Sequence, residues 1–170
     1  MKNTKKMVLL SLLTSIALVI YVIEAQIPVI LPGIKLGLAN AISLLALIIM
    51  GPKEALTIML LRTLLGTFLG GNMSAFLYSL SGGILSNVIM IILYKKFNES
   101  FSLWSISIAG AIFHNIGQLF IAALVVQDFK IYFYLPVLMI SAIAAGYFIG
   151  LVTNFLSKHL EKIPFLKGIS

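Results

Sequence analysis

Arg62 is the residue whose position demands a chemical explanation, because it stands midway along an apolar stretch of residues 55–69. An arginine at the centre of a membrane-spanning helix costs about 2.5–3.5 kcal/mol on insertion scales, so it must face a bundle interior, a partner or water. Glu54 shares its helix face but lies about 12 Å away by helix rise, too far for a direct pair. Gly66 and Gly70 extend that face and predict space beside the guanidinium. Two roles stay open: a ligand for a solute, or a staple that holds helix-end carbonyls.

A second polar group consists of His114, Asn115 and Gln118, within an apolar stretch of residues 103–126. His114 and Gln118 are one helical turn apart and share a face. One buried histidine is usually a packing residue, but three polar groups within five residues favour the wall of a cavity. We expect no metal site here, because the other histidine, His159, is far along the chain and no carboxylate pattern accompanies His114.

A third group, Glu24, Lys35 and Asn40, surrounds the predicted connection between the first and second apolar stretches. Side chains in this connection could close over a solute and bind it. Equally, Glu24 could mark the point where the first helix leaves the membrane. Arg62 and Lys35 would suit an anionic group, and the many aromatic residues would suit a flat ring.

Enzymatic chemistry is not expected. The chain has five acidic residues, and they are scattered, so no two are spaced to bind magnesium together. There is no glycine-rich phosphate loop with a lysine. There is no cysteine, which excludes a thiolate nucleophile and a thiolate metal site. We therefore predict a binding or transport protein with no cofactor and no metal.

The elements that must position these residues are membrane-spanning helices. Of 170 residues 61% are hydrophobic and 10% are charged, whereas a soluble domain carries roughly 25% charged residues. One crossing needs about 20 residues. We predict an all-α integral membrane protein, a six-transmembrane-helix bundle that forms a single transmembrane domain over residues 1–170. The predicted helices cover about residues 7–23, 36–50, 55–69, 73–94, 103–126 and 131–156.

The distribution of lysines predicts the orientation. Six crossings place both termini on one face, and cytoplasmic loops carry the excess of basic residues. That face would hold nine lysines, against Lys35 and Lys130 on the other, so we expect cytoplasmic N- and C-termini. The first apolar stretch exceeds the usual length of a signal-peptide core and is expected to stay as a helix. The nine are Lys2, Lys5, Lys6, Lys53, Lys95, Lys96, Lys158, Lys162 and Lys167.

Small residues spaced four apart predict helix contacts, because helices in lipid associate by close packing. Ala142, Gly146 and Gly150 form one such row in the last stretch. Ser11 and Ser15 form another on the first helix, in the half expected to be cytoplasmic. Packing within the chain is the ordinary explanation of such rows. For Ser11 and Ser15 we also consider a docking face for a partner subunit.

Four motifs, taken together, resemble one family of small bacterial membrane proteins. They are Leu31-Pro32-Gly33-Ile34-Lys35-Leu36-Gly37-Leu38-Ala39-Asn40, Gly51-Pro52-Lys53-Glu54-Ala55, Leu61-Arg62-Thr63-Leu64-Leu65-Gly66 and Ser79-Leu80-Ser81-Gly82-Gly83. The family is the Gx transporter family, often labelled heptaprenyl diphosphate synthase component I. It is similar to the substrate-binding S components of energy-coupling factor (ECF) vitamin transporters.

The resemblance implies a six-helix S component in the bacterial cytoplasmic membrane. It would capture a vitamin- or cofactor-precursor-like solute from outside and dock on a transmembrane coupling subunit driven by two cytoplasmic ATPases. Docking in that class uses alanines four apart on the first helix, and this chain has Ser11 and Ser15 there. The alternatives are an accessory subunit of a quinone, isoprenoid or membrane redox system without a solute, and a membrane enzyme subunit for prenyl substrates. Aspartate-rich magnesium motifs, which prenyl diphosphate synthases use, do not occur in the sequence.

Overall fold

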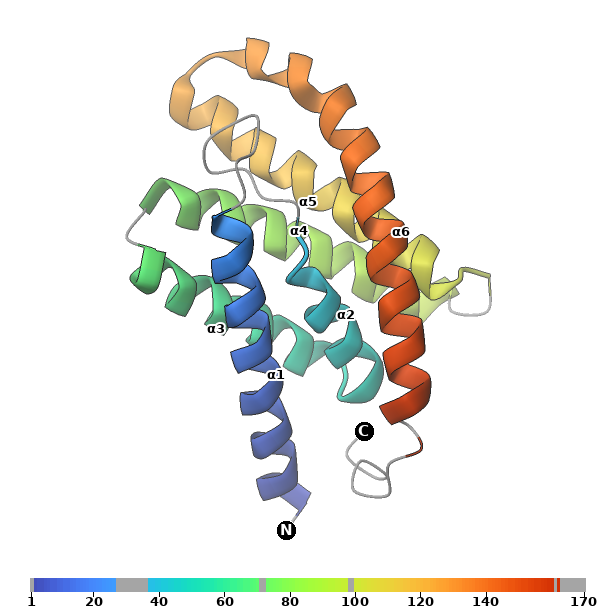
Figure 1. Cartoon of the computed structure of the whole chain (residues 1–170). Coiled ribbons are helices and arrows are strands. Elements are labelled where there is room, and N and C mark those ends of the chain that lie inside the picture. The colour runs from blue at the N-terminus through green and yellow to red at the C-terminus, as the bar shows by residue number, and fades with distance from the viewer. Residues whose placement is uncertain (1, 27–36, 71–72, 98–99, 161, 163–170) are drawn as a thin grey trace.

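The computed structural model describes residues 2–26, 37–70, 73–97, 100–160 and 162. These residues form α-helices and one short 3-10 helix, with no strand among them (Figure 1). The predicted all-α class is therefore confirmed. In chain order the elements are α1 (Lys2–Ala25), α2 (Asn40–Ile49), α3 (Pro52–Gly70), α4 (Met73–Phe97), α5 (Leu103–Val126), η1 (Phe129–Tyr134) and α6 (Leu135–Leu160).

Four of the described helical segments are long and apolar enough to cross a membrane: Thr4–Glu24, Ala75–Phe97, Leu103–Val126 and Phe129–Leu160. They lie in α1, α4, α5 and the run of η1 and α6. α2 has 10 residues, which corresponds to about 15 Å and half of a hydrocarbon core of about 30 Å. α3 carries Lys53, Glu54 and Arg62. The protein is thus a multi-pass helical membrane protein, while six full crossings remain a prediction.

The helix ends follow local chemistry. α5 begins after Ser102, whose side chain accepts a hydrogen bond from the Ser105 N–H, and it ends at Gln127 in the left-handed conformation. These bounds agree with the predicted residues 103–126. α6 starts later than predicted, because Asp128 accepts from the Lys130 N–H and opens η1 first. Pro136 then occupies the first turn of α6, where the absent N–H costs nothing.

The short helix α2 is the centre of the fold. Its residues 42–47 are all buried, and it contacts each of the other five α-helices. Gly37 and Gly51, with φ of +81° and +111°, lie just outside its two ends. A helix enclosed on all sides needs no polar face, which explains why α2 is apolar apart from Asn40 and Ser43. The predicted span of residues 36–50 was too long because these two left-handed positions limit the helix.

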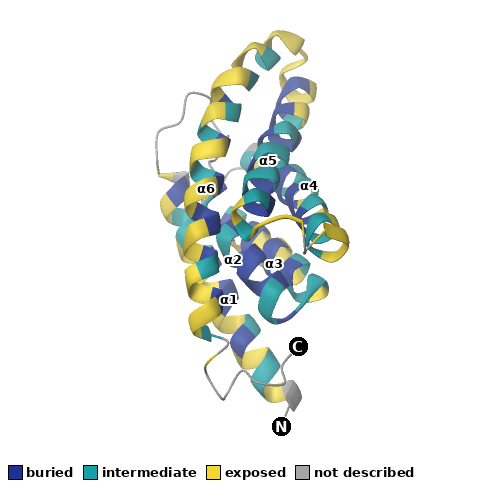
Figure 2. Cartoon of the chain, turned by 90° about the vertical axis from the view of Figure 1, so that its right-hand side faces the viewer, coloured by how far each residue is buried: buried dark blue, intermediate teal, exposed yellow. Residues whose placement is uncertain are grey.

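The remaining helices pack around α2 in two groups. α5 packs along both α4 and α6, and α1 packs along α3. Figures 1 and 2 place the beginning of α1 and the end of α6 at the same end of the molecule. The exposed residues of α6 and α1 are mainly apolar and lie on their outer faces (Figure 2). Such a surface suits contact with lipid.

The small residues of α6 pack inside the chain. A Cβ added at Gly150 would lie 2.3 Å from the Trp104 Cα, and one at Gly146 would lie 2.7 Å from the Ile108 Cα. Ala142, one turn earlier, is buried as well. The row predicted from the sequence is therefore the contact between α6 and α5.

The predicted orientation can be tested by labelling single cysteines, because the natural chain has none. Lys96 at the end of α4 and Asp128 after α5 are both exposed, and the 24 residues of α5 separate them by about 36 Å. We expect an impermeant maleimide to label Lys96→Cys and Lys162→Cys only from the cytoplasmic side. Asp128→Cys should react from outside. Labelling of the Lys96 and Asp128 positions from the same side would contradict the predicted topology.

Candidate functional site

Arg62 is buried at the middle of α3, with 2% of its surface exposed. One terminal nitrogen, Nη2, donates a hydrogen bond to the Asn40 Oδ1 of α2 at 2.5 Å. The guanidinium carbon lies 5.9 Å from the centre of the Tyr21 ring of α1, within the range of a cation–π contact. Side chains of two other helices therefore contact Arg62: Asn40 of α2 and Tyr21 of α1.

Glu24, near the end of α1, supplies the charge opposite to Arg62. Its carboxylate is buried and interacts electrostatically with the guanidinium. It also accepts a hydrogen bond from the backbone N–H of Gly37, just before α2. Glu24 thus lies inside the bundle and does not mark an exit into water. Glu54, the acid on the same helix as Arg62, instead pairs with Lys6 of α1 at 2.6 Å.

His114 and Gln118 reach the same region from α5, and both are buried. A Cβ placed on Gly37 would lie 3.0 Å from Asn40 Nδ2 and 3.1 Å from His114 Cδ2. A Cβ on Gly82 of α4 would lie 2.7 Å from the His114 backbone oxygen and 2.8 Å from Gln118 Cγ. Glycine at both positions therefore lets the backbone approach these polar side chains. We call Glu24, Asn40, Arg62, His114 and Gln118 the polar core.

Two donors of the polar core are unused. Arg62 Nε and Asn40 Nδ2 are buried and have no hydrogen-bond partner among the residues that the structure describes. An unsatisfied buried donor costs about 1–3 kcal/mol. The polar core can therefore hold the acceptor oxygens of a bound molecule or of water.

Two residues predicted to bind solute are not part of this group as described. Asn115 turns to α6, where its Nδ2 donates to the Leu138 carbonyl oxygen at 2.9 Å. Its role in this structure is to join α5 to α6. Lys35 lies outside the described residues.

Tyr21 is the neighbour of the polar core that the sequence reasoning missed. Its ring occupies the space predicted beside Arg62, since a Cβ on Gly66 would come within 2.3 Å of it. The prediction of open space at Gly66 is therefore wrong. The Tyr21 hydroxyl donates to the Ser79 Oγ of α4 at 3.1 Å. The spacing of three residues between Tyr21 and Glu24 places both on one helix face and was the available signal.

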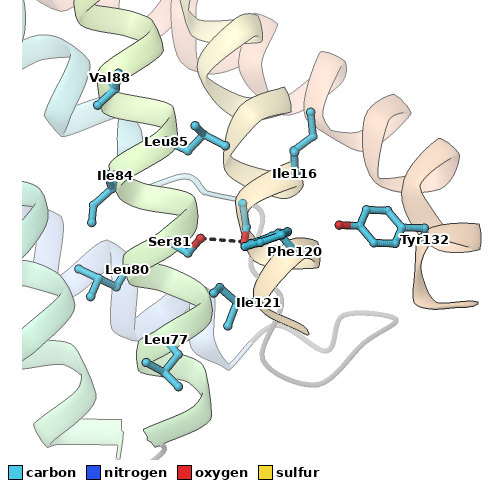
Figure 3. Close-up of a pocket in the computed structure, with 11 residues that line it drawn as sticks. Leu77, Leu80, Ser81, Ile84, Leu85, Val88, Ile116, Phe120, Ile121 and Tyr132 are labelled. Carbon is cyan, nitrogen blue, oxygen red and sulfur yellow. Dashed lines mark hydrogen bonds between the residues drawn. The ribbon is translucent and has the colours of Figure 1, made fainter. Parts of the chain in front are cut away.

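A separate apolar groove of about 670 Å³ lies between α4 and α5 and is bordered by η1 (Figure 3). Its only hydroxyls are those of Ser81, which donates to the Gly117 carbonyl at 2.9 Å, and of Tyr132, which points toward Phe120 in the figure. No acidic residue and no member of the polar core lines it. The groove suits a hydrocarbon chain. Its lining residues are Leu77, Leu80, Ser81, Ile84, Leu85, Val88, Ile116, Gly117, Phe120, Ile121 and Tyr132.

The predicted docking residues Ser11 and Ser15 are exposed on α1. The Ser15 hydroxyl donates to the Ser11 backbone carbonyl oxygen at 2.9 Å, so the Ser15 side chain stays close to the helix. Leu12 and Ile16 beside them are exposed too. The outer face of α1 therefore offers another helix a contact surface with small side chains at Ser11 and Ser15.

The ion pair of Lys6 and Glu54 ties this end of α1 to the first turn of α3. Burial alone would raise the pKa of Glu54, but the hydrogen bond from Lys6 and the charges of Lys6 and Lys53 bring that pKa below its usual value. The carboxylate is therefore ionised near neutral pH.

In the described part of the chain, no three His, Asp or Glu side chains are grouped so that they could hold a metal ion.

Comparison with known proteins places these features in one family. A family model described as heptaprenyl diphosphate synthase component I matches residues 13–156. That range contains every residue of the polar core. Comparisons with curated proteins and with solved structures gave no match. Because the family model covers most of the chain, the protein belongs to the heptaprenyl diphosphate synthase component I family.

Proposed function

We propose that this protein is the membrane-embedded substrate-binding component of an ECF-type transporter, and that it captures a small solute at the polar core. The observation that carries the proposal is the pair of unused donors, Arg62 Nε and Asn40 Nδ2, in a buried site. Four helices contribute side chains to that site, although each of these side chains is costly to bury. A bound solute with acceptor oxygens would offset this cost.

The location of the site supports uptake from outside. The N–H of Gly37 and the end of α1 lie beside Arg62, and the lysine distribution favours an orientation in which this end of α1 is at the outer face of a bacterial cytoplasmic membrane. A solute would enter there. The cytoplasmic end of α1 would be left for a partner.

Native mass spectrometry of gently purified protein would identify a co-purifying solute. The melting temperatures of variants, measured with and without that molecule, would then test whether the polar core binds it. His114→Ala and Gln118→Ala should each weaken binding by roughly 1–3 kcal/mol, the scale for a buried group left unpaired. The melting temperature without solute should change little.

Asn115→Ala is the matched control, since it lies on the same helix but bonds to α6. It should lower the melting temperature equally with and without solute. The same behaviour in His114→Ala and Gln118→Ala would contradict solute capture and leave the polar core a structural feature.

The partner in this proposal is a transmembrane coupling subunit that is driven by two cytoplasmic ATPases. The coupling subunit would dock on the face of α1 that carries Ser11 and Ser15. Both side chains are exposed, and small residues four apart permit close approach of a helix. We expect the double variant Ser11→Leu, Ser15→Leu to lose co-purification with the coupling subunit and to melt like the natural protein.

Ala144→Leu is a suitable control for docking, because it adds similar bulk to an exposed position of α6. It should leave the complex intact. If the complex survives the double serine variant as well, α1 is not the docking face.

A second candidate is an accessory membrane subunit of an isoprenoid or quinone system. The groove between α4 and α5 favours it, because its apolar lining suits an isoprenoid chain, and the family description names a heptaprenyl diphosphate synthase. This candidate predicts that the co-purifying molecule is a polyprenyl lipid. It also predicts that the binding of this lipid is insensitive to His114→Ala. The groove has no acidic lining residue, so a magnesium-dependent prenyl transfer in it is not part of the proposal.

A further inference from the structure

We infer that the polar core selects an uncharged ring compound with carbonyl oxygens, and that Glu24 excludes anions from it. The inference rests on the proposed function and names the class of solute. It differs from the simplest expectation for a buried arginine, which is an anionic ligand.

The charge balance carries the first step. Among the described residues that are buried, Arg62 and Glu24 are the two with a formal charge. Glu24 accepts from the Gly37 N–H, the Gly37 carbonyl accepts from the Asn40 N–H, and the Asn40 side chain accepts from Arg62. The two opposite formal charges therefore belong to one hydrogen-bonded group and cancel before any solute enters. An anion would leave one negative charge unbalanced in a medium of low dielectric constant, where an uncompensated charge is costly. An uncharged solute leaves the pair balanced.

The hydrogen-bonding groups carry the second step. A guanidinium can only donate, so the bond from Arg62 identifies the facing atom of Asn40 as its oxygen and turns the amide NH₂ elsewhere. The unused groups of this joined pair are then both donors, Arg62 Nε and Asn40 Nδ2. Two neighbouring donors call for acceptor oxygens, which carbonyl groups supply.

The neighbouring side chains carry the third step. The Tyr21 ring flanks the guanidinium at 5.9 Å, and the His114 ring lies against Gly37. A flat aromatic molecule can stack on such rings or meet them edge to face, which stabilises it beyond the area that it buries. Carbonyl groups attached to a ring therefore fit this environment better than those of a flexible chain.

The experiment compares three probes of one ring size on the purified full-length protein: 1,4-naphthoquinone, 1,4-naphthoquinone-2-sulfonate and naphthalene. The chain has no cysteine, so the quinones cannot be lost to a thiol of the protein. We expect naphthoquinone to bind at least tenfold more tightly than either of the other two, measured by calorimetry in detergent. In Glu24→Gln the sulfonate should bind more tightly than it does to the natural protein. The ratio of the naphthoquinone affinity to the sulfonate affinity should therefore fall at least tenfold.

The outcomes separate this inference from the proposed function. Tighter binding of the sulfonate than of naphthoquinone to the natural protein overturns the inference and leaves solute capture standing. Absence of quinone binding, when mass spectrometry finds another solute, also overturns the inference and leaves solute capture standing. Absence of both quinone binding and any co-purifying molecule overturns the proposed function too. The comparison on the natural protein decides the matter even if Glu24→Gln fails to fold.

Discussion

Arg62→Met is expected to lower the free energy of unfolding by about 3–5 kcal/mol, the usual loss when a buried charge is left without its counter-charge. The substitution leaves the Glu24 carboxylate buried without its counter-charge and the Asn40 Oδ1 without its donor. For a chain of this size the melting temperature should fall by on the order of 10 °C. Thermal unfolding of the purified variant in a fixed detergent measures the effect.

The double variant Arg62→Met, Glu24→Gln shows whether the loss comes from the pair. If it does, removing both charges should cost less than the sum of the single changes, because neither leaves a lone buried charge. Leu65→Met, at a half-exposed position one turn from Arg62, is the control and should change little. Additive losses in the double variant would mean that Glu24 does not balance Arg62.

Gly150→Leu is expected to have the second large effect, because it forces α6 away from α5. The added Cβ would lie 2.3 Å from the Trp104 Cα, and a backbone atom cannot turn aside as a side-chain end can. Overpacking of this kind costs about 1–3 kcal/mol or more. We expect the upper part of that range.

Trp104 reports this change directly. It is the only tryptophan in the chain, and its ring lies 5.7 Å from that of Tyr147 on α6. Its fluorescence should change in Gly150→Leu along with the fall in melting temperature. Ala144→Leu, which places the same side chain at an exposed position of α6, should change neither. Equal behaviour of the two variants would show that the glycine row does not hold α5 and α6 together.

Local patterns were sufficient to predict most of the helices. Apolar runs long enough to span a membrane predicted α1, α4, α5 and α6 to within a few residues at most ends. The α6 glycines identified a contact face because close packing needs small side chains wherever the partner comes from. α2 was misjudged because its length depends on the left-handed conformations at Gly37 and Gly51.

The candidate site was predicted only in part. The sequence singled out Arg62, His114 and Gln118 because each is costly in an apolar helix. Spacing along one helix could not separate Asn115 from His114, since adjacent residues point about 100° apart and the neighbouring helices decide what each meets. In the structure His114 faces Gly37 and Gly82, whereas Asn115 bonds to α6.

The sequence by itself determined that this protein is helical, that it belongs in a membrane and that Arg62 must be shielded from lipid. These properties follow from composition and from the cost of burying charge, and neither depends on which helices touch. The tertiary structure alone decided that Glu24 on α1 balances Arg62, that Asn40 on the central helix α2 binds it, and that Tyr21 fills the space at Gly66. Those pairings depend on how α1, α2 and α3 are rotated against one another. Interactions between side chains far apart in the chain set that rotation, and no local pattern encodes it.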